Sequence, residues 1–297
     1  MYRPPDDDAP AFALPAGASR AAAGWRARLE LGFARRGERT VLAHRLRSGP
    51  LAIQKPLYPE GPVCHAVVLH PPGGVAAGDR LDLAVELQAG AHALVTTPGA
   101  TKWYKAGPDR PASQRIDVVL REQARLDWLP QDNIYFDGSH VRQRFCLRLA
   151  DGATALGWDA ALLGRRASGE TWQGAQLRCL TRIAGGDGRP LWEERQAIAS
   201  GDPVLAAPQG LDGLPAYGTL WGAGPACTPE LAQLLAPDLP YGENLRAGAT
   251  ALPGGVLLVR AAARQPEAVR RLFAGLWLRL RPIVHGVPAR PLRLWST

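Results

Sequence analysis

Side chains that bind metal ions and exchange protons occur together in one segment of the chain, at Cys64, His65 and His70. Thiol and imidazole groups are ligands for divalent transition metals, so a transient metal site that uses these three residues is chemically feasible. His65 and His70 together with Asp79 would suit a metal-dependent hydrolase, although the sequence lacks the spacing expected for the third metal ligand. A lone histidine in a turn is more often a structural residue that forms hydrogen bonds. Both interpretations of this segment stay open.

Nucleophilic catalysis finds little support elsewhere in the chain. No Gly-x-Ser-x-Gly segment occurs, and the six histidines are isolated. Four carboxylates, Asp79, Asp132, Asp137 and Glu170, occur in or beside loops. Such carboxylates usually cap turns or pair with arginine, which is their simplest interpretation. The four cysteines are dispersed without Cys-x-x-Cys spacing, and this favours buried, reduced thiols over a zinc site.

A loop of fixed shape must position several of these residues. His70-Pro71-Pro72-Gly73-Gly74 is followed closely by Gly78-Asp79-Arg80. The prolines remove amide donors and fix φ, whereas the glycines permit positive φ. Apolar residues 67–69 before the loop and alternating residues 80–87 after it predict a strand on each side. The loop lacks the Gly-Lys-Ser/Thr ending of a phosphate-binding loop, so no nucleotide site is predicted.

Strands dominate the predicted structure from Trp25 to about Ile183, because apolar and polar residues alternate through this range. A loose unit with apolar residues at equivalent positions occurs three times. Its copies are Val85-x-Leu87-x-x-x-Ala91-x-Ala93, Val118-x-Leu120-x-x-x-Ala124-x-Leu126 and Leu147-x-Leu149-x-x-x-Ala153-x-Ala155. The repeat suits coils of chain stacked on one another. Turn signals at Gly90, Gln123 and Gly152 suit hairpins in a β-sandwich as well.

A short helix is predicted in the last third of the chain. Thr228 can cap its first turn, and Pro229 suits the first helical position. Leu231, Leu234 and Leu235 would then lie on one face of the helix.

A longer helix is predicted from Pro266 to Arg281, where apolar residues recur at helical spacing and Pro282 stops the helix. Its simplest role is to cover one face of the stacked strands. The alternative is a docking face that includes Trp277 and the flanking arginines, since Trp and Arg are enriched where proteins bind one another.

The chain is basic, with a formal net charge of +8, and nearly all of its basic residues are arginines. A nucleic-acid-binding protein is therefore one alternative function. The arginines are scattered through strand-like segments, however, with no basic tail and no helix that concentrates them. A basic surface that binds acidic protein partners explains the charge as well.

Residues 1–23 are rich in Pro, Ala and Asp without periodicity, which predicts a flexible tail. Asp6-Asp7-Asp8 oppose the positive segment that a secretory signal needs, and no apolar run reaches about 18 residues. We therefore expect a cytoplasmic protein that does not span a membrane. No linker interrupts mid-chain and 46% of the residues are hydrophobic, so residues 24–297 are predicted to form a single domain.

Four segments resemble, in the same order, the signature segments of the family of urease accessory proteins called UreD, or UreH in some species. The first runs from Leu69 through the proline-glycine loop to Leu81, and the others are Thr96–Tyr104, Leu126–Ile134 and Gly164–Glu170. One match could arise by chance, whereas four in order hardly could. Ala77 departs from the family, which usually has glycine at this position. The departure affects the expected fine geometry of the loop more than its identification.

The resemblance implies a mainly β protein, built as a β-helix-like stack of strands with a few helices toward the C-terminus. It also implies an accessory protein and not an enzyme. Members of the family bind apo-urease and the UreF protein, while the GTPase UreG delivers Ni²⁺. The ion then passes through a water-filled tunnel to the buried urease site, so Ni²⁺ in transit is expected and no tightly bound cofactor.

Under this resemblance, Asp79 and Glu170 are the first candidates for the nickel path, Asp132 and Asp137 follow, and His70 is a further candidate. A cluster of thiols and imidazoles would hold Ni²⁺, because this ion stands high in the affinity series. Scattered carboxylates, carbonyls and water would attract the ion weakly and release it. The sequence offers acidic residues in shaped loops and no high-affinity metal motif. Nucleic acid is not an expected partner.

Overall fold

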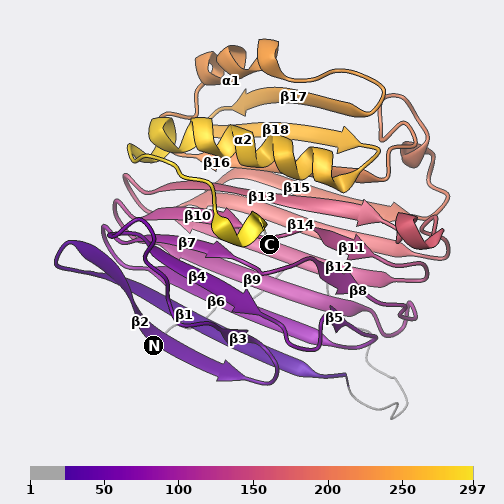
Figure 1. The fold of residues 1–297 in the computed structure, drawn as a ribbon, viewed down its shortest axis with the longest axis horizontal. Helices are drawn as coiled ribbons and strands as arrows, with labels where there is room; N and C mark the ends of the chain where they lie inside the picture. Colours follow the sequence, from indigo (N-terminus) through magenta and orange to yellow (C-terminus); the bar gives the residue numbers. More distant parts are fainter. Residues whose placement is uncertain (1–23, 297) are drawn as a thin grey trace.

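The computed structural model describes residues 24–296, which are mainly β-structure in two large sheets (Figure 1). The predicted tail, residues 1–23, lies outside the described residues. That the rest of the chain forms one domain stays a prediction. No helix in the described part is long and apolar enough to cross a membrane.

The first sheet has seven strands in the order β15-β14-β12-β9-β6-β1-β2. They are β1 (Arg26–Arg36), β2 (Arg39–Ser48), β6 (Arg80–Leu87), β9 (Ala112–Leu120), β12 (His140–Leu149), β14 (Gln176–Gly185) and β15 (Pro190–Ala199). The strands from β1 to β14 pair in parallel, and β2 and β15 close the two edges in antiparallel fashion.

The second sheet has eleven strands, with β17-β18-β16-β13-β10-β7-β4-β3 in order and β5, β8 and β11 beside them. Its strands are β3 (Ala52–Ile53), β4 (Cys64–Leu69), β5 (Gly74–Val75), β7 (His92–Thr96), β8 (Thr101–Trp103), β10 (Arg125–Leu129), β11 (Asn133–Tyr135), β13 (Thr154–Leu163), β16 (Ala216–Ala223), β17 (Leu245–Leu252) and β18 (Val256–Ala263). The chain alternates between the sheets, as β4-β5-β6, β7-β8-β9, β10-β11-β12 and β13-β14. This is a β-solenoid of about four coils, which confirms the predicted stack and excludes the hairpin sandwich for this region.

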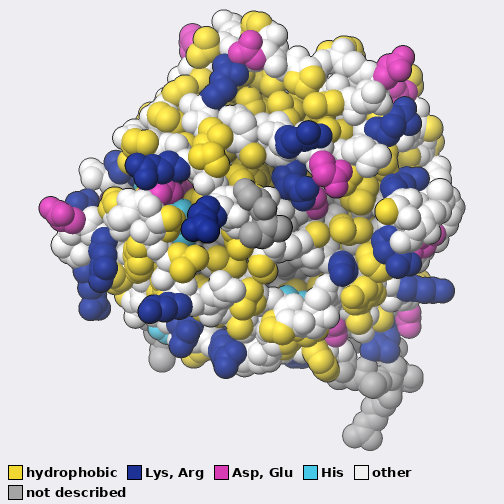
Figure 2. Space-filling view, viewed as in Figure 1, with side chains coloured by type: hydrophobic (Ala, Val, Ile, Leu, Met, Phe, Trp, Pro, Cys, Tyr) yellow, Lys and Arg dark blue, Asp and Glu magenta, His cyan; other side chains and the backbone are white. Residues whose placement is uncertain are grey.

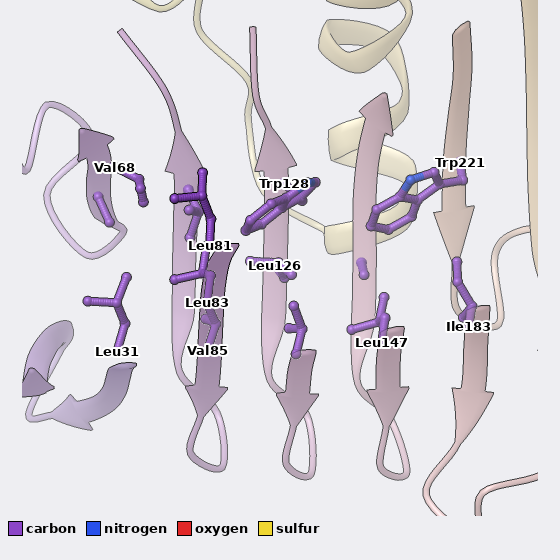
Figure 3. Packing of buried hydrophobic residues seen from close by; sticks show 14 of the residues in the cluster. Leu31, Val68, Leu81, Leu83, Val85, Leu126, Trp128, Leu147, Ile183 and Trp221 are labelled. Atoms are coloured by element: carbon purple, nitrogen blue, oxygen red, sulfur yellow. The ribbon is translucent and has the colours of Figure 1, made fainter. Parts of the chain in front are cut away.

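The sequence repeat defines the register of the coils. Val118 pairs with Val85 on one side and Leu147 on the other, and Leu126 pairs with Ala93 and Ala155 in the same way. Equivalent side chains therefore lie in rows between the two sheets (Figure 3). The alternation from Trp25 to Ile183 exists because every second residue enters this shared core.

Two α-helices lie near the C-terminus, α1 (Pro229–Leu235) and α2 (Pro266–His285). Helix α2 packs on β13, β16 and β18, and it crosses the outer face of the eleven-stranded sheet (Figure 1). Short 3₁₀ turns are η1 (Arg166–Ser168), η2 (Pro203–Leu205), η3 (Ala236–Asp238) and η4 (Arg293–Ser296). The prediction of a few helices toward the C-terminus is confirmed, with β17 and β18 lying between α1 and α2 in the chain.

Three expectations about the helices were wrong in detail. Helix α2 continues through Pro282 to His285 and ends at Gly286, which has the left-handed φ of 67°. Proline near a helix end removes one amide donor, and burial of Val284 and His285 holds the last turn in place. Leu234 is 62% exposed and does not share the buried face of α1. Trp277 is 1% exposed, so it cannot belong to a docking face.

Candidate functional site

Asp79 lies at the corner where the proline-glycine loop enters β6. Its Oδ1 accepts a hydrogen bond from the backbone N of Trp25 at 2.7 Å, and its Oδ2 accepts one from the N of Ala76 at 2.9 Å. The loop is shaped as predicted, because a Cβ on Gly74 would lie 2.4 Å from a ring carbon of Tyr104. Asp79 thus fixes the turn and also ties the start of β1 to it.

Asp137 and Glu170 meet at an equivalent corner of later coils, before β12 and β14. The backbone N of Asp137 donates to Glu170 Oε2 at 3.2 Å, and Asp137 Oδ1 accepts from the N of Gln173 at 2.9 Å. Arg165 donates from its Nε to Glu170 Oε1 at 2.9 Å. Hydrogen bonds from Arg165 lower the pKa of Glu170. The two carboxylates, 33 positions apart in the chain, therefore belong to one hydrogen-bonded corner.

Asp132 and His70 lie at other corners, after β10 and β4. Asp132 is 6% exposed, and its Oδ2 lies 3.3 Å from Nη1 of Arg270 on α2. Burial raises the pKa of Asp132, and the Arg270 charge opposes this rise. His70 is half-buried, and burial lowers its pKa against the opposing charge of Asp79. The five candidates thus form two small groups and a separate ion pair, and their role with nickel stays a prediction.

The transient metal site predicted from Cys64, His65 and His70 does not converge on one point. Cys64 and His65 are neighbours in β4, so their side chains point to opposite faces of the sheet. Cys64 packs in the core between the sheets, with its Sγ 3.7 Å from the hydroxyl of Tyr58. His65 Nε2 lies on the outer side, 2.8 Å from Glu60 Oε1. The geometry therefore argues against a metal bound by Cys64, His65 and His70 together.

A cavity of about 130 Å³ lies between the two sheets. Its walls combine aromatic and aliphatic side chains with polar ones, and the polar ones include Gln114, Asn133, Gln143, Asp159, Glu194, Gln196, Tyr217 and Thr219. Gln143 is central, because it accepts from the hydroxyl of Tyr135 and donates from its Nε2 to Gln114 Oε1 at 3.2 Å. Most of the cavity wall is apolar, and this network places a group of polar side chains inside the solenoid, for which we call it the polar cavity.

Two carboxylates face this cavity. Burial, together with the negative charge of Glu194, raises the pKa of Asp159 to about 7. Glu194 is paired with Arg260, whose Nη1 and Nη2 lie 3.0 and 2.6 Å from its two oxygens. Burial also raises the pKa of the Cys179 thiol, so this group stays protonated. The cavity therefore holds weak oxygen ligands and no thiolate.

A buried polar cluster between the outer face of the eleven-stranded sheet and α2 was missed by the sequence interpretation. Asp127 is 0% exposed, and it accepts hydrogen bonds from Trp277 Nε1 at 2.7 Å and Arg281 Nε at 3.1 Å. His92 Nε2 lies 2.9 Å from Asp127 Oδ2, and His285 Nε2 lies 3.5 Å from Oδ1. Burial alone would raise the pKa of Asp127, but the two histidines hold it well below its usual range.

In this cluster His92, Asp127 and His285 each offer one ligand atom, and these three atoms lie within 4.8 Å of one another, which a metal ion could bridge. A guanidinium already lies at that carboxylate, and Arg281 Nη1 also contacts Glu60 at 2.5 Å. A second cation would meet the repulsion of a buried positive charge. The donor set thus fits a resident arginine better than a metal. An aspartate in the apolar segment Leu126–Leu129 was the only signal in the sequence.

Comparison with known proteins identifies the family of the chain. The family model for the UreD urease accessory protein matches residues 25–296. The chain belongs to the UreD family of urease accessory proteins. A UreD of Cupriavidus pinatubonensis is 53% identical over 276 residues, covering 92% of this chain and 95% of that protein. A UreD of Ralstonia nicotianae is 52% identical, covering 93% and 95%, and one of Bordetella pertussis is 41% identical, covering 92% and 98%.

Membership of the UreD family confirms the resemblance found in the four sequence segments. The UreD relatives are named as accessory proteins, which fits a protein that serves urease without catalysing a reaction. The match extends from β1 to the last 3₁₀ turn, so it includes the solenoid, α2 and the polar cavity.

Proposed function

We propose that this protein is a scaffold for the maturation of urease, and that it conducts Ni²⁺ through the interior of its solenoid. It binds apo-urease and UreF, and through UreF the GTPase UreG that delivers the ion. It acts without turnover and holds no resident cofactor. The cytoplasm is the proposed location.

The polar cavity between the sheets is the observation that supports this proposal. A solenoid of this size has no structural need for Asp159 and Glu194 at an internal cavity, because burying carboxylates opposes folding. Oxygen ligands from carboxylates and amides bind Ni²⁺ less tightly than thiolates and imidazoles do. Because the Cys179 thiol stays protonated, an ion in this cavity would be attracted and then released.

The corner residues are proposed as the ends of the same path. Asp79, Asp137 and Glu170 lie where the chain enters strands of the seven-stranded sheet, and His70 and Asp132 lie where it leaves strands of the other. None of the five lines the cavity itself, and Asp132 is paired with Arg270 on α2, so they are proposed as stations outside the cavity. The carboxylates of Asp79, Asp137 and Glu170 already accept hydrogen bonds from backbone N–H groups, which would limit how strongly they hold a passing ion.

The test is urease maturation in a host that lacks this protein. Urease is co-expressed with its accessory proteins and with wild-type chain, Asp159→Asn/Glu194→Gln or Asp79→Asn/Glu170→Gln, and nickel per urease is measured by atomic emission. We expect both variants to lower nickel loading, whereas pull-down of UreF and apo-urease stays unchanged. The matched control is Asp187→Asn/Glu243→Gln, which removes the same charge at exposed turns.

Full nickel loading of urease with both path variants would refute the proposal that Ni²⁺ passes through the solenoid. A loss of partner binding in the pull-down would instead show that these carboxylates shape the interfaces. If nickel loading is normal without the chain, the accessory role itself is refuted.

A further inference from the structure

The outer face of the seven-stranded sheet carries arginines in register across neighbouring strands. Arg26, Arg80, Arg142 and Arg178 lie in one row, with Ser113 and Ala197 at its other two positions. We call this the arginine row. It crosses six strands, a width of roughly 24 Å at the usual strand spacing. No carboxylate occurs at any of its positions.

The arginine row faces away from the core. Its neighbours in the strands, such as Ala27, Leu81, Val141 and Leu177, are buried between the sheets, and alternate residues of a strand point to opposite faces. The strands that α2 covers, β13, β16 and β18, all belong to the other sheet, and α1 packs on β17 and β18. Neither helix therefore packs on this face.

Like charges on adjacent strands are destabilising, and Arg142 pairs directly with Arg178 in the parallel ladder. Four arginines of this sheet relieve such repulsion with a carboxylate two positions along the strand, namely Arg28, Arg80, Arg115 and Arg195. Arg80 Nε lies 2.8 Å from Asp82, and Arg115 Nε lies 2.6 Å from Asp117. Within residues 24–296, Arg142 and Arg178 have no such ion pair. The sheet thus holds an uncompensated pair of arginines on β12 and β14, toward its β15 edge.

We propose that the arginine row binds an acidic segment of a protein partner. The observed ion pairs show that carboxylates fit the arginines of this face, and planar guanidinium groups bind carboxylates in bidentate fashion. Nucleic acid fits less well. Neither this row nor the next, formed by Arg28, Asp82, Arg115, Arg144, Leu180 and Arg195, presents an aromatic ring on which a base could stack.

The inference goes beyond nickel conduction and does not depend on it, because the row lies outside the solenoid and the cavity lies inside. Binding is therefore tested without urease, by fluorescence anisotropy of a short labelled poly-glutamate peptide with the full chain. Arg142→Gln/Arg178→Gln is compared with Arg264→Gln/Arg271→Gln, which removes the same charge from the face that α2 covers. On that face basic side chains are interspersed among apolar surface (Figure 2).

We expect the Arg142/Arg178 variant to bind the peptide about fivefold to tenfold more weakly at low salt, and the control to bind as wild type. Its thermal midpoint should be unchanged or higher, because a like-charge contact is removed. Equal weakening in both variants would reduce the effect to net charge and overturn the proposal. Tighter binding of a single-stranded oligonucleotide of equal charge, lost in the same variant, would overturn it in favour of nucleic acid.

Discussion

Asp127 shows how a single charged residue can be stable in the interior of this protein. Its carboxylate is fully buried, yet each oxygen accepts from at least one donor, from Trp277 and Arg281 on α2 and from His92 on β7. The guanidinium of Arg281 is also fully buried and extends the cluster to Glu60. The network therefore joins the helix to the solenoid by a few charge-assisted bonds.

Replacing Asp127 with Asn should destabilise the fold by about 3 to 5 kcal/mol, because the fully buried Arg281 loses one of its two carboxylate partners and keeps only Glu60. Urea unfolding followed by tryptophan fluorescence measures the change. In the double variant Asp127→Asn/Arg281→Met most of the loss should return, since the buried guanidinium is removed as well and Glu60 keeps its contact with His65. An equal loss in the single and double variants would contradict this account.

Asp159 should make stability depend on pH in a defined direction. The pKa of Asp159 is about 7 in the folded state, whereas a free aspartate has a pKa near 3.9. Between these two pH values the folded state therefore binds a proton that the unfolded state does not. Stability from this group therefore falls as pH rises from about 4 to about 7. Asp159→Asn should be more stable than wild type by on the order of 1 to 3 kcal/mol at pH 8, and by less at pH 5.5.

The comparison with wild type at each pH removes the contributions of other groups. His92 is one of them, since burial lowers its pKa and it destabilises the fold as pH falls below about 6.5. Urea unfolding at both pH values provides the measurement. The same stability difference at pH 5.5 and 8 would refute the raised pKa of Asp159.

At the scale of elements, the coils are joined by equivalent turns. Gly90, Gln123 and Gly152 have φ values of 66°, 55° and 67°, all in the left-handed region. The copies of the sequence unit therefore share the same backbone conformation at this turn as well. Gln123 is the exception, because a residue with a Cβ is strained in this region.

Gln123→Gly should therefore stabilise the fold by up to about 1 kcal/mol, whereas Gly90→Ala should destabilise it by about 1 to 2 kcal/mol. A Cβ on Gly90 meets only Arg35 Cδ, at 3.8 Å, so backbone strain and not a clash would cause the loss. Thermal unfolding by circular dichroism measures both variants. A destabilised Gln123→Gly protein would show that the side chain of Gln123 contributes more than its strain.

At the scale of the whole molecule, the solenoid separates three regions, one interior and two outer faces. Its interior holds the polar cavity, the outer face of the eleven-stranded sheet is covered by α2, and the outer face of the seven-stranded sheet holds the arginine row. The proposed nickel conduction and the proposed binding of an acidic partner should therefore be separable by mutation. Variants at Asp159 should leave peptide binding unchanged, because that residue faces the cavity.

The sequence by itself determined the family and the strands, and the family resemblance favoured stacked coils where the repeat alone left hairpins open. Alternation specifies which side of each strand is buried, and the three-fold unit specifies register, because equivalent residues pair across neighbouring coils. The two helices were found from spacing and capping. The end of α2 was not, since packing of its last turn outweighed the effect of Pro282.

Only the tertiary structure decided which charged residues meet. His92, Asp127 and His285 come from segments far apart in the chain, and no local pattern relates them. Likewise, Asp159 and Glu194 face one cavity, and Arg142 and Arg178 become neighbours, only when coils stack in register. Hydrophobic periodicity is a local property that a sequence displays, whereas contacts between polar groups depend on the three-dimensional path of the chain.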